Sequence, residues 1–578
     1  MADEERRRVA AADAGTEAWR RWGPYLSERA WGTVREDYSP DGSAWSYFPF
    51  EDAHRRTFRW SEDGMAGVCD DSQLLCLALG LWNGRDPILK ERMYGLTGDQ
   101  GNHGEDVKEY WWYLDATPTA SYLRWRYHYP QAAFPYQDLR TENRRRSRLD
   151  PEYELVDTGI FACDRMWVVE VEWAKAAPDD LLWRITVHNA GPDPATIDVL
   201  PTMWFRNYWD WGVEVVKPEI TLANPAAGDV TLLATQRHLG ARVLHAAGSP
   251  EPMFCDNETN AAALWPGTTS PPYPKDGIAN HVISGAATVN PDHRGTKAAL
   301  RYHLSVPAGA TTELRLRFSP DPYVAGADLV DGFSQVMAAR RAESDALYAS
   351  LAPADAGTDE QAVMRQAFAG MVWSKQFFHY DVARWLDGDP TQPPPPEARR
   401  QGRNSGWVHL NNHDVISMPD PWEYPWYAAW DLAFHCVTLA HIDPAFAKSQ
   451  LILLGREWYM HPNGQLPAYE WSFDDVNPPV QAWAALRIYQ IEARARAARG
   501  EAGDGDLDFL ERVFHKLVLN FTWWVNRKDS EGNNLFEGGF LGLDNIGPFD
   551  RSTLPVSGYL EQSDGTAWMA MYCQNLLD

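Results

Sequence analysis

The chain has 578 residues, of which 44% are hydrophobic and 13% aromatic, and this length suggests two large domains. Its 53 Lys and Arg against 80 Asp and Glu give a formal net charge of −27. The excess of negative charge argues against nucleic acid or an anionic membrane surface as a partner and favours a neutral ligand.

The N-terminal segment and the cysteines indicate a cytoplasmic protein. The segment MADEERRRVAAADAG has no apolar signal sequence, and no run approaches the roughly 18 apolar residues of a membrane span. The cysteines lack the spacing of metal sites or disulfide frameworks, so we expect buried thiols. They are Cys69, Cys76, Cys163, Cys255, Cys436 and Cys573. We expect neither a metal nor a cofactor.

Residues from about 150 to 320 predict antiparallel strands. Apolar and polar residues alternate at 169–173, 183–188 and 314–318, which is the period of strands with one buried face. Many short strands at this spacing indicate a sandwich. We therefore expect an N-terminal β-sandwich domain at 1–320, which includes a helical and loop extension, and a linker at 321–357.

Amphipathic helices follow from residue 358 to the end. The spacing predicts helices at 359–377, 426–440, 444–459, 479–499 and 507–526, with a sixth beginning near Thr566. Cap signals support them: Thr358 with Gln361, Asp443 before Pro444, and Gly500. Long connections follow the first, third and fifth helices, and short ones follow the second and fourth. In up-down helices the long connections share one face, which points to an active site there.

The long connections hold clustered carboxylates and aromatic residues. A sugar ring has apolar C–H faces that pack on aromatic rings and hydroxyls that need charged or amide partners, so this composition suits a saccharide. The chain has 28 Trp, 24 Tyr and 21 Phe, and several Trp, such as Trp407, lie in polar loops. The candidate site residues are Trp430, Asp431, Phe434, Glu470, Trp471, Asp474, Asp544, Asn545 and Glu561.

Each candidate also has a structural explanation. Asp544 with Asn545 could form an Asx turn, Asp431 could be a favourable charge at a helix N-terminus, and Glu470 could belong to a solvated loop or a cap. His409, His413 and Asp414 are ligand-type residues, but no second cluster completes a metal site. Trp side chains could simply be buried where helices pack.

Several longer motifs resemble glycoside hydrolase family 63, in its bacterial and fungal members related to processing α-glucosidase I. In the helical half they are GGFLGLDNIGPFDRS, EQSDGTAWMAMYC, GQLPAYEWSFDDVNPPVQAWA and WYAAWDLAFHC. In the N-terminal half they include WGTVREDYS, FRWSEDGMAGVCDD, LWNGRDPILKERMYGLTGDQGNHGEDVKEYWWYLD and LPTMWFRNYWDW. The resemblance covers nearly the whole chain. It implies an α+β multidomain protein with a β-sandwich, an (α/α)6 toroid and inverting hydrolysis of α-glycosides.

The resemblance also implies roles for individual residues. Asp544 matches the general acid in a G-L/M-D-N motif, Asp431 matches a substrate-binding position, and Glu470 with Asp474 matches a pocket-lining loop. The family places its general base in a glutamate loop near the end of a twelve-helix ring. With about six helices after residue 358, we expect an incomplete toroid at 358–578 without that base, so this chain alone could be inactive. We therefore expect an α-glucosidase that acts on an oligosaccharide or small glycoside; a non-catalytic sugar-binding protein and an inverting phosphorylase are the alternatives.

Overall fold

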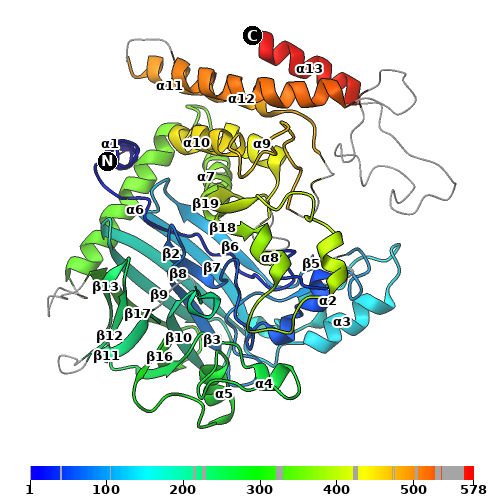
Figure 1. The fold of residues 1–578 in the computed structure, drawn as a ribbon. Helices are drawn as coiled ribbons and strands as arrows, with labels where there is room; N and C mark the ends of the chain where they lie inside the picture. The colour runs from blue at the N-terminus through cyan, green and yellow to red at the C-terminus, as the bar shows by residue number, and fades with distance from the viewer. Residues whose placement is uncertain are drawn as a thin grey trace.

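The computed structural model has a β-rich body, a long helix beside it and a layer of helices above it (Figure 1). The long helix is α6 (Asp331–Leu351), and it lies beside the N-terminal helix α1 (Ala2–Asp13). The structure describes residues 2–39, 42–104, 106–212, 216–223, 229–320, 329, 331–420, 427–470, 473, 476–500, 505–527, 536 and 565–578.

Two antiparallel sheets form the body, which confirms the predicted β-sandwich. The six-stranded sheet has the order β1 (Trp22–Gly23), β2 (Met65–Asp70), β3 (Leu75–Trp82), β10 (Ala195–Phe205), β16 (Lys297–Val306), β14 (Glu251–Cys255). The nine-stranded sheet has the order β15 (Arg294–Gly295), β11 (Glu219–Ala223), β12 (Val230–Gln236), β13 (Gly240–Ala246), β17 (Thr311–Pro320), β9 (Asp180–Asn189), β8 (Met166–Ala177), β7 (Tyr122–Pro130), β6 (Trp111–Ala116). The strands thus begin well before residue 150.

Alternation along the central strands separates a core face from a polar face. Trp173 of β8 and Trp183 of β9 are direct cross-strand partners, and their rings stack at 4.4 Å in the core. On the opposite face Glu170 of β8 binds Arg124 at 2.8 Å. Side chains that alternate with a period of two therefore stabilise both faces of the sheet.

Short elements complete the body. The helices are α2 (Ala44–Tyr47), α3 (Tyr136–Arg145), α4 (Ala261–Leu264) and α5 (Gly277–Ser284), and β4 (Gly95–Leu96) pairs with β5 (Asp106–Val107). Single 3₁₀ turns lie at Phe50–Asp52, Leu155–Thr158, Ala162–Asp164, Trp209–Trp211 and Glu397–Gln401.

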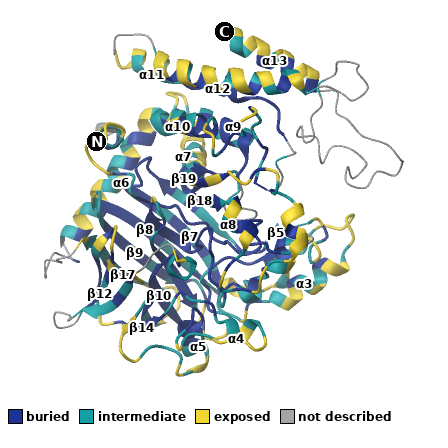
Figure 2. Ribbon diagram, viewed as in Figure 1, coloured by how far each residue is buried: buried dark blue, intermediate teal, exposed yellow. Residues whose placement is uncertain are grey.

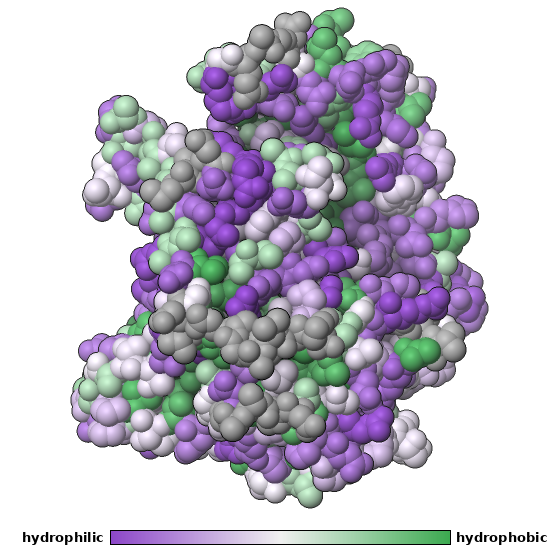
Figure 3. All heavy atoms as spheres, turned by 90° about the vertical axis from the view of Figure 1, so that its left-hand side faces the viewer, coloured by the Kyte–Doolittle hydropathy of each residue, from purple (hydrophilic) through white to green (hydrophobic). Residues whose placement is uncertain are grey.

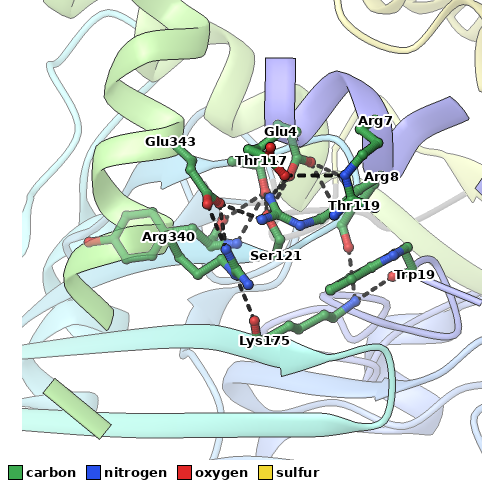
Figure 4. Close-up of polar contacts among 12 residues, drawn as sticks. Glu4, Arg7, Arg8, Trp19, Thr117, Thr119, Ser121, Lys175, Arg340 and Glu343 are labelled. Carbon is green, nitrogen blue, oxygen red and sulfur yellow. Dashed lines mark hydrogen bonds and ion pairs between the residues drawn. The ribbon is translucent and has the colours of Figure 1, made fainter. Parts of the chain in front are cut away.

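Buried charges hold α1 against the body and α6 (Figure 4). Arg8 of α1 donates to Glu5 at 3.0 Å and to Glu343 of α6 at 2.5 Å. Glu5 in turn accepts hydrogen bonds from the Thr119 hydroxyl at 2.7 Å and from the Ser121 hydroxyl at 2.6 Å. Helix α6 is 21 residues long and lies within 321–357, so the expected linker contains a packed helix.

The helical layer contains the six predicted helices in the predicted order, and one additional short helix, within the described part of the chain. They are α7 (Thr358–Trp373), α9 (Ala429–Leu439), α10 (Pro444–Leu454), α11 (Gln481–Ala498), α12 (Leu507–Asn526) and α13 (Gly565–Leu577). The first long connection is not an irregular loop, because it contains β18 (Lys375–Asp381), α8 (Val382–Asp387) and β19 (Asn411–Ser417). Helix α7 ends at Trp373 because the chain enters β18 two residues later.

Two of the three predicted caps are confirmed. The Asp443 carboxylate accepts the Phe446 N–H at 3.2 Å ahead of α10, and Gly500 follows α11 with a φ of +75°. At α7 the prediction is wrong by one residue. Glu360, not Gln361, reaches back and accepts the Gly357 N–H at 2.7 Å. All six cysteines are free thiols, but Cys163 and Cys573 are exposed, contrary to the prediction.

Burial is densest in the body, whereas the outer helices α11 and α12 expose much of their surface (Figure 2). Hydrophilic residues cover most of the face shown in Figure 3, with smaller hydrophobic patches among them. In the described part of the chain, no helix combines the length and the apolar content needed to span a bilayer.

Candidate functional site

The N-terminal turn of α9 carries Trp430 and Asp431. The residue before the helix, Ala428, has no side chain that could cap the first N–H groups of α9, and the Ala468 carbonyl accepts the one from Ala429. The N-terminal end of the helix favours the negative charge of Asp431 in the first turn. Asp431 is half-buried, and burial raises the pKa of its carboxyl. A partly desolvated carboxylate at the end of a helix can accept hydrogen bonds from ligand hydroxyls.

Aromatic rings flank this carboxylate. The Trp430 and Phe434 rings meet edge to face at 5.7 Å, and Phe434 lies 5.3 Å from Trp483 of α11. Phe434 is 40% exposed, which is unusual for a phenylalanine in a packed helix. Trp430 and Asp431 thus lie in the first turn of α9 and Phe434 one turn later, which brings an aromatic surface close to a carboxylate. Their contact with a sugar stays a prediction.

Glu470 lies inside the protein and not on an open surface. Its side chain accepts the Tyr427 N–H at 2.8 Å, and its second oxygen lies 3.6 Å from Nε of Arg35. Burial raises the pKa of Glu470 to about 7, although Arg35 and the Tyr427 N–H lower it. The expectation that Glu470 lines a pocket is therefore not met in this structure, because 1% of the residue is exposed.

The position of Glu470 instead ties the second long connection to α9. The Ala429 N–H donates to the Ala468 carbonyl at 3.0 Å, so this backbone hydrogen bond and the one from the Tyr427 N–H to the Glu470 carboxylate join the two segments. Asn404 donates to the Glu470 carbonyl at 2.8 Å and to the Tyr380 hydroxyl at 2.7 Å. Glu470 therefore positions the backbone that leads into Trp430 and Asp431.

The β-rich body contributes residues that the sequence analysis missed. Arg35 reaches Glu470, and Asp37 accepts a hydrogen bond from Arg403 of the first long connection at 2.9 Å. Arg59 forms two hydrogen bonds with the buried Asp389, at 2.6 and 3.0 Å. The charged residues within 31–39 could have indicated that this segment forms ion pairs. Their partners could not be predicted, because they are more than 300 residues away and only the fold brings them together.

The β18–β19 hairpin pairs His379 with His413. Their rings lie 5.0 Å apart, and the Trp60 ring of the body lies 5.2 Å from His379. Burial lowers the pKa of both histidines, which keeps the imidazoles neutral at pH 7. Trp407 is 2% exposed and packs in the core, so it does not offer a face to a ligand.

One group of carboxylates in the described part of the chain has metal-ligand spacing: Asp106, Glu152 and Glu154. Lys108 lies among them, with Nζ at 2.7 Å from Glu152 and 3.0 Å from Glu154 and in contact with Asp106. An ammonium group thus holds the place that a cation would take. His409, His413 and Asp414 do not form such a group.

Five candidate residues lie outside the described residues: Trp471, Asp474, Asp544, Asn545 and Glu561. The structure brings together Trp430, Asp431 and Phe434, and it places Glu470 beneath the backbone that precedes them.

Comparison with known proteins bears on this part of the chain. Residues 424–545 match the family model described as the mannosylglycerate hydrolase MGH1-like glycoside hydrolase domain. The chain carries a glycoside hydrolase-like domain. This domain includes α9, Glu470 and, at its end, Asp544 and Asn545. The match does not distinguish family 63 from other glycoside hydrolases.

One curated relative is the uncharacterized protein YMR196W of Saccharomyces cerevisiae, 45% identical over 604 residues. The match covers 97% of this chain and 55% of the relative, so the chain spans about half the length of that protein.

Solved structures are more distant. A putative kojibiose phosphorylase from the human microbiome is 9% identical, with 94% of this chain and 64% of that chain covered and a TM-score of 0.29. A family GH92 α-mannosidase from Bacteroides thetaiotaomicron is 11% identical, with 62% and 42% covered and a TM-score of 0.23. At such scores these two similarities carry no argument about the glycoside hydrolase-like domain.

Proposed function

We propose that this chain belongs to an inverting glycosidase of the family 63 type that hydrolyses α-glucosides. The match of residues 424–545 to a glycoside hydrolase domain carries the proposal, because that range contains every candidate site residue except Glu561. The exposed aromatic rings and half-buried carboxylate at the start of α9 support it, since they suit a sugar ring and its hydroxyls.

Inverting hydrolysis needs two carboxyl groups about 6.5–9.5 Å apart, one to protonate the departing oxygen and one to activate water. We assign the general acid to Asp544 on the sequence motif. Asp431 binds sugar hydroxyls, Trp430 and Phe434 provide the apolar contact, and Glu470 positions the backbone before α9. Trp471, Asp474, Asn545 and Glu561 are proposed to contact the substrate, and the half-toroid is the proposed scaffold.

Since no general base is assigned in this chain, the test uses a longer relative that carries one, and it compares that protein with the Asn variant of the aspartate that matches Asp544, on maltose and on α-glucosyl fluoride. Asn keeps the shape but cannot donate the proton, so maltose hydrolysis should slow by roughly 10²–10⁴-fold. Fluoride needs little protonation to leave and should be affected much less. The Asn variant of the residue that matches the neighbouring Asp550 is the matched control.

Three results would contradict this assignment. Equal slowing of both substrates would make Asp544 a binding residue. Sugar binding without turnover in the unmodified longer relative would favour a non-catalytic binding protein, and a strict requirement for phosphate would favour a phosphorylase. The anomer released first, followed by NMR, should be β-glucose if hydrolysis inverts the configuration.

A further inference from the structure

A hollow of about 370 Å³ lies between the strand β6 and the helix α7, outside residues 424–545. Its walls include the side chains of Asp106, Tyr110, Trp111, Trp112 and Gln366, and one helical position without a side chain, Gly370. Ligand pockets in proteins typically measure about 300–1,000 Å³, so the hollow is large enough for one sugar residue.

The hollow exists because α7 covers the edge of the nine-stranded sheet incompletely. Strand β6 is the last strand of that sheet in the described structure. Trp373 of α7 closes one end, since its indole N–H donates to the Asp115 carbonyl at 3.2 Å and its ring stacks on Tyr113 at 5.2 Å. One turn earlier the helix has Gly370, where an added Cβ would meet no atom within 4 Å.

Glycine inside a helix is unfavourable by about 1 kcal/mol relative to alanine. The backbone of α7 does not require it, because Gly370 has no positive φ. The neighbouring positions on the same side are Gln366 and Trp373, four residues before and three after. The missing side chain at this point of α7 therefore keeps space open beside β6, on the side where Tyr113 packs on Trp373.

The wall chemistry selects the class of ligand. Trp111 and Trp112 are half-buried, so part of each indole is accessible to a ligand. Asp106 and the exposed Gln366 amide provide an acceptor and a donor for hydroxyl groups. Lys108 is already surrounded by Asp106, Glu152 and Glu154, so the hollow offers no free ammonium to a phosphate or carboxylate.

We propose that this hollow binds a neutral pyranose ring and gives the protein a second saccharide contact in its β-rich body. One indole face holds the C–H face of the ring, and Asp106 and Gln366 hold its hydroxyls. The site uses residues of β5, β6 and α7, and it does not depend on the hydrolysis proposed for the glycoside hydrolase-like domain.

The experiment is a saturation-transfer NMR titration with methyl α-glucoside on the whole chain. Gly370→Leu fills the hollow, and Trp112→Ala removes an aromatic wall. Either change should weaken binding at this site by about tenfold or more, which corresponds to the loss of one good aromatic contact. Ala362→Leu adds the same side chain to an exposed position of α7 and should leave the affinity unchanged.

Circular dichroism and melting temperature show which variants are folded. If Gly370→Leu is folded and binds like the unmodified protein, the proposal is wrong; if it does not fold, an unchanged affinity in Trp112→Ala overturns it. Asp431→Ala in the same titration separates the two proposals. If Asp431→Ala abolishes binding and Gly370→Leu preserves it, the glycosidase proposal stands and the proposal of a sugar site in the hollow is wrong. If only Gly370→Leu weakens binding and no substrate is hydrolysed, the result would support the sugar site in the hollow and not the glycosidase proposal.

Discussion

The β-rich body and the helical layer use apolar residues differently. In the body the largest rings are almost completely enclosed, as at Trp173 and Trp183. In the helical layer α12 leaves Leu507, Phe514 and Leu519 between 45% and 56% exposed, beside an apolar hollow of about 320 Å³ between α11, α12 and α13. The body is thus the more completely packed half, and the candidate sugar contacts of the glycoside hydrolase-like domain are at helix ends and connections.

A pair of matched substitutions tests this contrast directly. Phe318 in β17 is fully buried and its ring packs on Trp22 at 4.7 Å, so Phe318→Ala should lower the free energy of unfolding by about 3–5 kcal/mol. Phe514→Ala in α12 should change it by about 0.5 kcal/mol or less. Urea unfolding of both variants measures the difference, and equal losses would contradict the comparison.

The next largest effect on stability is expected at the buried ion pair Arg59–Asp389, which joins the β-rich body to the first long connection. Burial would raise the pKa of Asp389, but the adjacent Arg59 holds it below its ordinary value. Asp389→Asn removes the hydrogen-bonded counter-charge of the buried Arg59 guanidinium and leaves Asp210, 3.7 Å away, as a more distant one, so it should destabilise the protein by up to about 3–5 kcal/mol. The double variant Arg59→Met, Asp389→Leu should lose less.

The exposed pair Arg165 and Asp193, 2.8 Å apart, is the control. Breaking it with Asp193→Asn should change stability by less than about 1 kcal/mol. A similar loss at the buried and the exposed pair would show that the Arg59–Asp389 contact does not hold the two halves together.

Glu470 should make stability depend on pH. Its pKa is about 7 in the folded protein, above the ordinary value of about 4.3, so between these values the folded state binds more protons than the unfolded state. Stability should therefore fall as pH rises from about 4.3 to 7, by up to about 1.4 kcal/mol per pH unit. Glu470→Gln keeps an acceptor for the Tyr427 N–H and should remove this slope. An unchanged slope in the variant would assign the effect to another group.

A substitution at Asp431 should have the smallest effect on the stability of the fold and a clear effect on sugar binding. Asp431→Ala should weaken sugar binding by about 1.5–3 kcal/mol, as expected for a lost hydrogen bond to a charged group. Its effect on stability should be only about 0.3–1 kcal/mol, the contribution of a carboxylate at a helix N-terminus. Asp359→Ala, in the first turn of α7, should match the stability change and leave binding unaffected. If Asp431→Ala and Asp359→Ala bind sugar equally well, Asp431 has a purely structural role.

Periodicity predicted most of the fold because it reports which face of an element is buried. The alternation at 169–173 and the apolar stripe at 507–526 correspond to β8 and α12. It did not predict β18, where Phe377 and Phe378 follow an amphipathic helix directly and the apolar pattern has no break. A short motif singled out Asp431, and its role as a sugar contact stays a prediction. The contacts of Glu470 with Arg35 depend on tertiary structure, since 435 positions separate the two residues and no local pattern links them.

The docking of α1 has a consequence for the order in which the protein folds. Its Glu5 and Arg8 find partners 114 and 335 positions later in the chain. An isolated helix of 12 residues is marginally stable in water, so α1 is not held in place until its partners have been synthesised. At about 5–20 residues per second, Glu343 follows Arg8 by roughly 20–70 s. Helix α1 should therefore dock late, and contacts of such long sequence separation slow folding.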